Sequence, residues 1–396
     1  MKGKYFYLCA ALFALNSCTN EINEDGFVDK SNTISFNSST PKSRAYTSGD
    51  VANTAKLQEG NFGVVGYSNN ALYLGTISKA AKQTYVGGNW EYANPGEIRY
   101  WPNNNMDFYA YFPFAESGDV FSNDNNSGNV MIITNNSGNQ DVLFASALNQ
   151  PRVDRVDLKF HHAFSKIKGI NIQIQNKDVT VEVKKVELIN TSTKGQVLVD
   201  VNGNASYGTG TEHRAKEMTS PVTITKGNTY DKKDTEGNPA PTYATLVNNN
   251  DNAYIFATNG TETNYVTGTN TALWNGTKNA LTEGKTLETL GQVCLKLTCK
   301  VSTPSSITGG KYYHVGDAGD DAYGEMYIPI SGSKITSIDP NNADKTALLA
   351  GKRYTYNIIM KDNVGFDVNG DAILLPILFK STSVDSWDDV TVTITL

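Results

Sequence analysis

Apolar and polar residues alternate with a period of two along much of the chain. The clearest runs carry valine, isoleucine, leucine or an aromatic residue at every second position, with polar residues between them. They are residues 156–160, 170–174, 179–183, 197–201 and 354–360. Because successive side chains of a β-strand point to opposite faces, this period predicts strands with one buried face. The pattern therefore predicts an all-β fold.

Turn signals divide these runs into short strands. Asn202-Gly203 and Asn369-Gly370 each follow such a run, and pairs of this kind are strong hairpin signals. Helical periodicity is scarce, so only the short segments 79–82 and 343–350 are predicted as helices. Stretches rich in Asn and Gly, such as 122–129, are predicted to be surface excursions. Many short strands with frequent turns favour sandwiches or barrels.

Residues 1–17 are predicted to be a lipoprotein signal peptide. Lys2 and Lys4 form a positive start, residues 5–15 are apolar, and Leu-Asn-Ser leads into Cys18. This is the order of a secretion signal. A small residue before a cysteine suits a lipoprotein signal peptidase, so Cys18 is predicted to become the acylated N-terminus. The alternative is a plain secretory signal in which this cysteine has no role.

The segment that follows is predicted to be a tether. Residues 18–44 are mostly polar, and one apolar alternation in them places Ile34 and Phe36 on the same side of a short strand. No later segment approaches the roughly 18 consecutive apolar residues that a membrane-spanning helix needs. The best candidate, residues 374–379, is short and contains a proline. The protein is therefore predicted to be anchored by lipid and not to span the membrane.

Charge and motifs argue against several function classes. The formal net charge is −6, so no broad basic face for nucleic acid is expected. Four histidines occur, and the adjacent His161 and His162 would point to opposite faces of a strand. The chain has no zinc-protease, nucleophile-elbow, P-loop or dinucleotide motif. We therefore predict no catalytic site, no metal and no cofactor.

Three weaker features are open to a structural interpretation. Cys294 and Cys299 would lie on opposite faces of one strand, so they are predicted to be buried apolar residues and not a redox or metal pair. Residues 367–371 resemble the start of a calcium loop, but the spacing of the glycine fits a hairpin turn better. Aromatic residues at 90–101 suit either glycan stacking or core packing, and core packing is favoured. They are Trp90, Tyr92, Tyr100 and Trp101.

Several segments, in order, resemble fimbrillin-like proteins, the type V pilin superfamily of Bacteroidales. They are the cysteine motif with acidic residues behind it, Ser43-Arg44-Ala45, Tyr100-Trp101-Pro102, residues 108–113, 141–145, 158–167 and 351–356, and Trp387 before a terminal strand. Each segment alone is loose, and together they cover the chain from end to end. The resemblance implies two tandem transthyretin-like β-sandwich domains. We place these domains at residues 45–162 and 163–396.

The resemblance also implies a route of assembly. An arginine-specific protease at the outer membrane would cut between Arg44 and Ala45 and remove the strand that carries Ile34 and Phe36. The C-terminal strand of a neighbouring subunit would then fill the groove, as in β-strand addition. Residues 390–396 are the candidate donor strand. One face of this strand would carry Val390, Val392, Ile394 and Leu396.

These observations predict a structural or adhesive pilin-like subunit on the cell surface. Its expected partners are copies of itself or other pilin subunits, together with a host or bacterial surface ligand. The alternative for the C-terminal run is the last strand of its own domain. The alternative function is a monomeric, lipid-anchored glycan-binding protein that uses Trp90, Trp101 or the Asn-rich loops.

Overall fold

The fold is that of a computed structural model of this chain. The described residues are 32–40, 54–115, 121–124, 128–135, 140–174, 179–192, 195–208, 213–217, 222–225, 232–233, 239–240, 244–247, 253–256, 272–278, 284–289, 291–305, 309–330, 335–336, 348–360, 365–373, 378–382 and 388–395. Cys18, Arg44, Ala45 and Leu396 lie outside them. The predicted all-β class is confirmed, since almost every described element is a strand.

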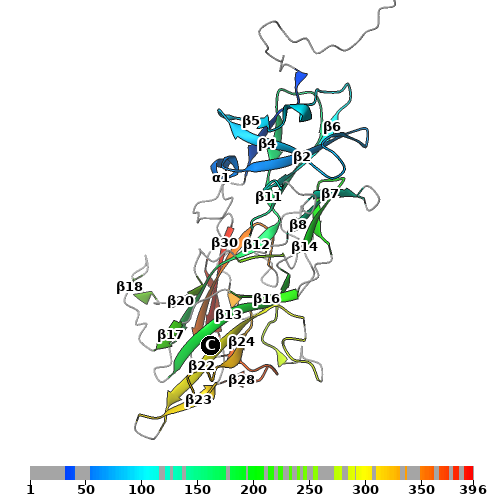
Figure 1. Cartoon of the computed structure of the whole chain (residues 1–396). Helices are drawn as coiled ribbons and strands as arrows, with labels where there is room; N and C mark the ends of the chain where they lie inside the picture. Colours follow the sequence, from blue (N-terminus) through cyan, green and yellow to red (C-terminus); the bar gives the residue numbers. More distant parts are fainter. Residues whose placement is uncertain are drawn as a thin grey trace, which may run out of the picture.

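The molecule is elongated, with the first strands at one end and the yellow and orange strands of the second half at the other (Figure 1). Its buried apolar residues form three separate clusters. Among the described residues, no helix has the length and apolar character needed to cross a membrane. The helices are α1 (Thr54–Gln58) and the 3-10 helix η2 (Pro95–Glu97).

The N-terminal sheet lies at the centre of three layers. Its order is β11-β9-β6-β2-β4-β5, with β3 beside β2. The strands are β2 (Asn61–Ser68), β3 (Ala71–Leu74), β4 (Ala81–Val86), β5 (Asn89–Tyr92), β6 (Met106–Phe112), β9 (Leu143–Gln150) and β11 (His161–His162). In β2, Phe62 and Val64 pack in one cluster while Val65 and Tyr67 pack in another, so both faces of the sheet are buried.

Two smaller layers cover these faces. One is the parallel pair β1 (Phe36–Ser39) and β10 (Val156–Lys159). The other, the middle sheet, has the order β15-β14-β8-β7, with β7 (Phe121–Asp124), β8 (Asn129–Asn135), β14 (Gly195–Asp200) and β15 (Ala205–Tyr207). The hydroxyl of Tyr109 in β6 donates to the carbonyl of Val201 at 2.7 Å, which ties the middle sheet to the N-terminal sheet.

The second half of the chain forms a sandwich of two sheets around the largest apolar cluster. The first sheet runs β20-β12-β26-β30-β29-β25, with β21 beside β12. Its strands are β12 (Phe164–Ile174), β20 (Ala244–Val247), β21 (Ala253–Phe256), β25 (Ile335–Thr336), β26 (Lys352–Met360), β29 (Leu378–Thr382) and β30 (Asp388–Thr395).

The facing sheet runs β16-β13-β22-β24-β27-β28, with β17 beside β13 and β23 beside β22. Its strands are β13 (Thr180–Ser192), β16 (His213–Glu217), β17 (Val222–Thr225), β22 (Cys294–Pro304), β23 (Lys311–Val315), β24 (Gly324–Ile328), β27 (Gly365–Phe366) and β28 (Ala372–Ile373). A separate pair joins β18 (Lys232–Lys233) and β19 (Pro239–Ala240).

Some local predictions were wrong. The predicted helix at 79–82 is absent: Lys79 forms an isolated bridge with Thr76, and Ala81, which pairs with Val64 of β2, begins strand β4. The surface excursion at 122–129 stays a prediction; its residues 122–124 and 129 belong to β7 and β8, which pair with each other. Of the predicted helix at 343–350, only 348–350 are described, and they are not helical. The division of domains at residue 162 stays a prediction, although β14 of the second half pairs with β8 of the first and with β15 on its other side.

Candidate strand-exchange site

The predicted short strand near Ile34 is present and forms part of a core. Residues 33–36 alternate between half-buried and buried positions, and Ile34 and Phe36 are both 0% exposed. The ring of Phe36 makes edge contacts with Phe108 and Phe62, at centroid distances of 5.4 and 6.3 Å. The alternation seen in the sequence therefore corresponds to the observed burial, in which two apolar side chains enter the N-terminal core.

Backbone hydrogen bonds hold this segment on both sides. Ile34 N–H donates to the carbonyl of Arg99 at 2.9 Å, and Val156 N–H donates to the carbonyl of Ser35 at 2.8 Å. Phe160 N–H donates to Ser39 at 2.8 Å at the other end. The segment therefore completes a layer that β10 alone cannot form, because among the described strands β10 pairs only with β1.

Side chains add three polar links. Ser35 Oγ donates to the Asp154 carbonyl at 2.6 Å, and Asn37 Nδ2 donates to Asp157 Oδ1 at 3.1 Å. On the other side, Trp90 Nε1 of β5 donates to Ser38 Oγ at 2.7 Å. These polar partners were not predicted. The Ser and Asn content of 35–39 does not identify partners that lie 52 to 120 residues away in the sequence.

The candidate donor strand lies in a different core. β30 pairs in parallel with β26 from Lys352↔Asp388 to Ile359↔Thr395, and antiparallel with β29 on its other side. Val392 is buried in the core of the second sandwich. In this structure, residues 388–395 are thus a strand of their own domain, which was the alternative for this run. Whether they also serve as a donor stays a prediction.

The aromatic cluster packs mainly inward. Trp90 is 6% exposed and contacts Phe62, with ring centroids 4.6 Å apart. Trp101 is half-buried, and its ring lies edge-on to Phe108 at 5.8 Å. Burial raises the pKa of Tyr92 well above its usual value. These contacts favour core packing over a flat, exposed platform for sugar rings.

The residues considered for metal or redox chemistry have structural surroundings. Cys294 and Cys299 are free and buried, and burial raises the pKa of both thiols. His162 Nδ1 lies 3.0 Å from the Asp141 carboxylate in a buried pair. Within the described ranges, no group of three or more His, Cys, Asp or Glu side chains is placed to hold a metal ion. The carboxylate of Asp367 accepts from the backbone N–H of Asp371 at 2.8 Å, as in a hairpin turn.

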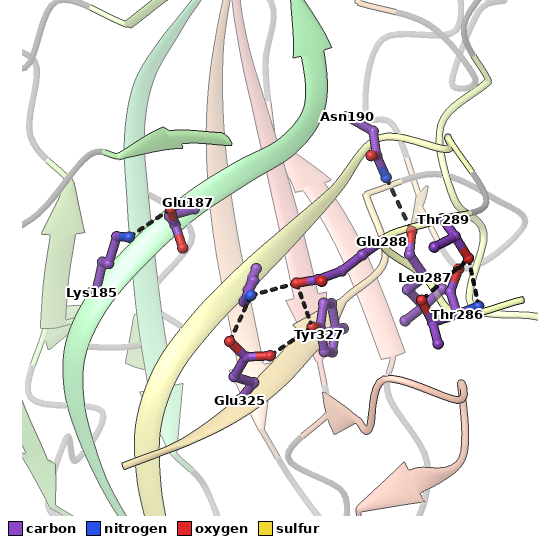
Figure 2. Close-up of polar contacts among 10 residues, drawn as sticks. Lys185, Glu187, Asn190, Thr286, Leu287, Glu288, Thr289, Glu325 and Tyr327 are labelled. Atoms are coloured by element: carbon purple, nitrogen blue, oxygen red, sulfur yellow. Dashed lines mark hydrogen bonds and ion pairs between the residues drawn. The ribbon is translucent and has the colours of Figure 1, made fainter. Parts of the chain in front are cut away.

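A polar network that the sequence did not predict lies on the second sandwich (Figure 2). Lys296 of β22 forms ion pairs with Glu288 and Glu325, the latter at 2.6 Å. Tyr327 donates to Glu288 and Glu325, each at 3.0 Å. The polar groups of the network pair with one another, so the network fits a structural role on the sheet and presents no nucleophile.

A search of curated proteins finds no match. Among solved structures, a fimbrial protein from Bacteroides vulgatus is 15% identical, with a TM-score of 0.42 over 92% of this chain and 97% of that one. A protein named for cell adhesion from Bacteroides uniformis is 13% identical, with a TM-score of 0.34 over 94% and 98% of the two chains. The model of the fimbrillin-like family matches residues 43–293, most of the chain, and the protein therefore belongs to the fimbrillin-like family.

Proposed function

We propose that this protein is a pilin-like adhesive subunit of the cell surface, and that residues 32–40 are a placeholder strand in its N-terminal domain. The observation that carries the proposal is the complete burial of Ile34 and Phe36 on a segment that precedes Arg44. A cut after Arg44 would separate this segment covalently from the domain whose core it completes.

The energetics of the segment suit replacement. Full burial of an Ile or Phe side chain contributes about 1.5–3 kcal/mol, and a backbone hydrogen bond about 0.5–1.5 kcal/mol. While the segment is part of the chain, these contacts are intramolecular. After cleavage, the same contacts hold a separate peptide, which another strand of similar pattern replaces by mass action.

The proposed replacement is the C-terminal strand of a neighbouring subunit. Val390, Val392, Ile394 and Leu396 alternate with threonines, so one apolar face would enter the groove that Ile34 and Phe36 leave. The contact joins different surfaces of the two copies, so it is heterologous and extends into a filament. Since β30 lies between β26 and β29 in the monomer, it must first leave its own sheet.

Cleavage and particle size together test this function. The chain from residue 18, with Cys18 replaced by Ser to prevent acylation, is treated with an arginine-specific protease. The expected result is a new Ala45 terminus together with ladders of oligomers. An excess of a synthetic peptide of residues 32–40 should suppress the ladders, because it refills the groove.

The matched control is the same peptide with Phe36 replaced by Ser, which should suppress the ladders far less. A chain that resists cleavage at Arg44, or that is cleaved and stays monomeric, would contradict strand exchange. It would favour the monomeric, lipid-anchored glycan-binding protein. Loss of ladders with both peptides would show that the competition is not specific to the groove.

A further inference from the structure

A cavity of about 630 Å³ lies beside the buried N-terminal segment. Thr33, Ile34 and Ser35 line it, together with all four residues of β5. The rest of the lining is Pro95, Ile98, Asp154 and Arg155. Near the other end of the segment, the hydrogen bond from Trp90 to Ser38 links β1 directly to β5. The cavity therefore opens where the placeholder strand begins.

The cavity follows the edge of β5. Successive side chains of a strand point to opposite faces, so a space on one face would be lined by every second residue. Here the consecutive residues 89–92 all line the cavity, which places it along the edge that the two faces share. Among the described strands β5 pairs with β4 alone and ends the N-terminal sheet.

The pairing with β4 determines which backbone groups face this edge. Ala93 N–H donates to the carbonyl of Lys82 at 2.9 Å. Bonded and non-bonded pairs alternate along an antiparallel ladder, so Glu91 also belongs to the set that bonds to β4. The N–H and C=O groups of Trp90 and Tyr92 therefore point away from β4, in the direction in which a further strand would add.

We propose that this cavity is a docking slot in which the C-terminal strand of a second copy binds the edge of β5 before the placeholder strand leaves. This inference rests on the proposed strand exchange and concerns its order of events. The incoming strand bonds to Trp90 and Tyr92 first and then displaces Ile34 and Phe36 in turn. Exchange through the slot avoids exposing both side chains to water at once.

The lining favours the C-terminal strand as the occupant. Ile98 and the partly exposed ring of Tyr92 offer apolar contacts to one face of an alternating strand. Arg155 is the one cation among the described lining residues, whereas Glu91 and Asp154 are acidic. The slot is also continuous with the seat of β1, which the same strand is proposed to fill.

The order of events is measured by the release of the placeholder strand. The chain from residue 18 carries a fluorophore on Cys18, while Cys294 and Cys299 are buried and react slowly. After cleavage at Arg44, a synthetic peptide of residues 388–396 is added, and fluorescence anisotropy follows the loss of the labelled segment. The release rate should rise in proportion to peptide concentration. A rate that does not depend on peptide concentration would overturn the slot while leaving strand exchange intact.

Two substitutions on the β4–β5 hairpin distinguish blocking of the slot from a general effect of adding an indole to the hairpin. Asn89→Trp places an indole in the slot. It should lower the slope of the release rate against peptide concentration about tenfold, which is equivalent to the loss of one or two hydrogen bonds. Val86→Trp is the matched control, because Val86 is opposite Asn89 in the β4–β5 pair, is 54% exposed and does not line the cavity. Equal effects of the two substitutions would contradict the proposal.

A second measurement does not depend on these variants. In the uncleaved chain, the peptide should slow amide hydrogen exchange at residues 90 and 92 while β1 remains in place. Unchanged exchange at a peptide concentration that drives release in the cleaved chain would rule out docking at β5. Failure of the peptide to release the segment or to bind the emptied groove would instead contradict the proposed function itself.

Discussion

At the scale of single residues, Phe36 does most to hold the placeholder strand in its groove. Its ring is fully buried and makes edge contacts with Phe62, Tyr92 and Phe108. Edge-to-face contacts add to the gain from burial, since the positive edge of one ring meets the negative face of another. Asn37, the next residue, is exposed and makes one polar link.

We predict that Phe36→Ala lowers the free energy of unfolding of the N-terminal domain by about 3–5 kcal/mol, because it leaves a cavity among aromatic rings. Asn37→Ala is the control and should cost less than about 1 kcal/mol. Denaturant unfolding of the uncleaved chain measures both. Equal stabilities of the two variants would mean that the placeholder strand is not part of the core.

The alternation of residues 33–36 was sufficient to predict that Ile34 and Phe36 share a buried face. The bond from Trp90 to Ser38 was not predictable in the same way, since it joins residues on two strands whose proximity depends on the whole fold. The sequence favoured core packing over sugar stacking for Trp90 but did not identify its neighbours. Tertiary contacts decided this question, because the ring of Trp90 packs against Phe62 and Tyr85 and its N–H donates to Ser38.

At the scale of elements, pairing between strands overrode local preferences. Residues 79–82 carry alanine and lysine, which favour helix, yet Ala81 pairs with Val64 and the segment opens β4. Residues 122–129 are rich in Asn, yet they include parts of β7 and β8, which pair with each other, and β8 also pairs with β14 of the second half. The sequence contained no local signal for these pairings, because each depends on a distant partner.

The polar network around Lys296 links β22 to β24 through the ion pair with Glu325 (Figure 2). Hydrogen bonds from Lys296 and Tyr327 lower the pKa of Glu288 below its ordinary value of 4.5, although burial opposes this shift. Burial acts to lower the pKa of Lys296, but hydrogen bonds to Glu288 and Glu325 raise it above 10.5. Both groups are therefore held in their charged forms.

We predict that Glu288→Gln destabilises the protein at neutral pH and that the difference from wild type shrinks in acid. A lowered folded pKa gives stability above the unfolded value of about 4.5, and this stability is lost as pH falls through the folded value. Thermal unfolding between about pH 3 and 8 measures the difference in stability between the variant and wild type, because this range includes the titration of the carboxylate. Glu59→Gln, which breaks the exposed pair with Lys56, is the control and should change little at any pH. A difference that does not vary with pH would contradict the network.

At the scale of the whole molecule, the two ends of the chain belong to different cores. The segment with Ile34 and Phe36 completes the N-terminal core, and β30 runs through the first sheet of the second sandwich. The C-terminal run of alternating apolar residues predicted a strand with one buried face. It could not distinguish a strand of its own domain from a donor, since both need the same alternation.

The position of β30 predicts the result of removing it. Deleting residues 390–396 should lower the melting temperature of the second sandwich and speed amide exchange in β26, because β26 and β29 lose the strand between them. A synthetic peptide of residues 388–396 should restore both properties when added to the truncated chain, whereas a scrambled peptide should not. If the truncated chain keeps its melting temperature and the protection of β26, β30 contributes little to its own sheet. Its release to a neighbouring subunit would then cost little, and truncation would block polymerisation without weakening the monomer.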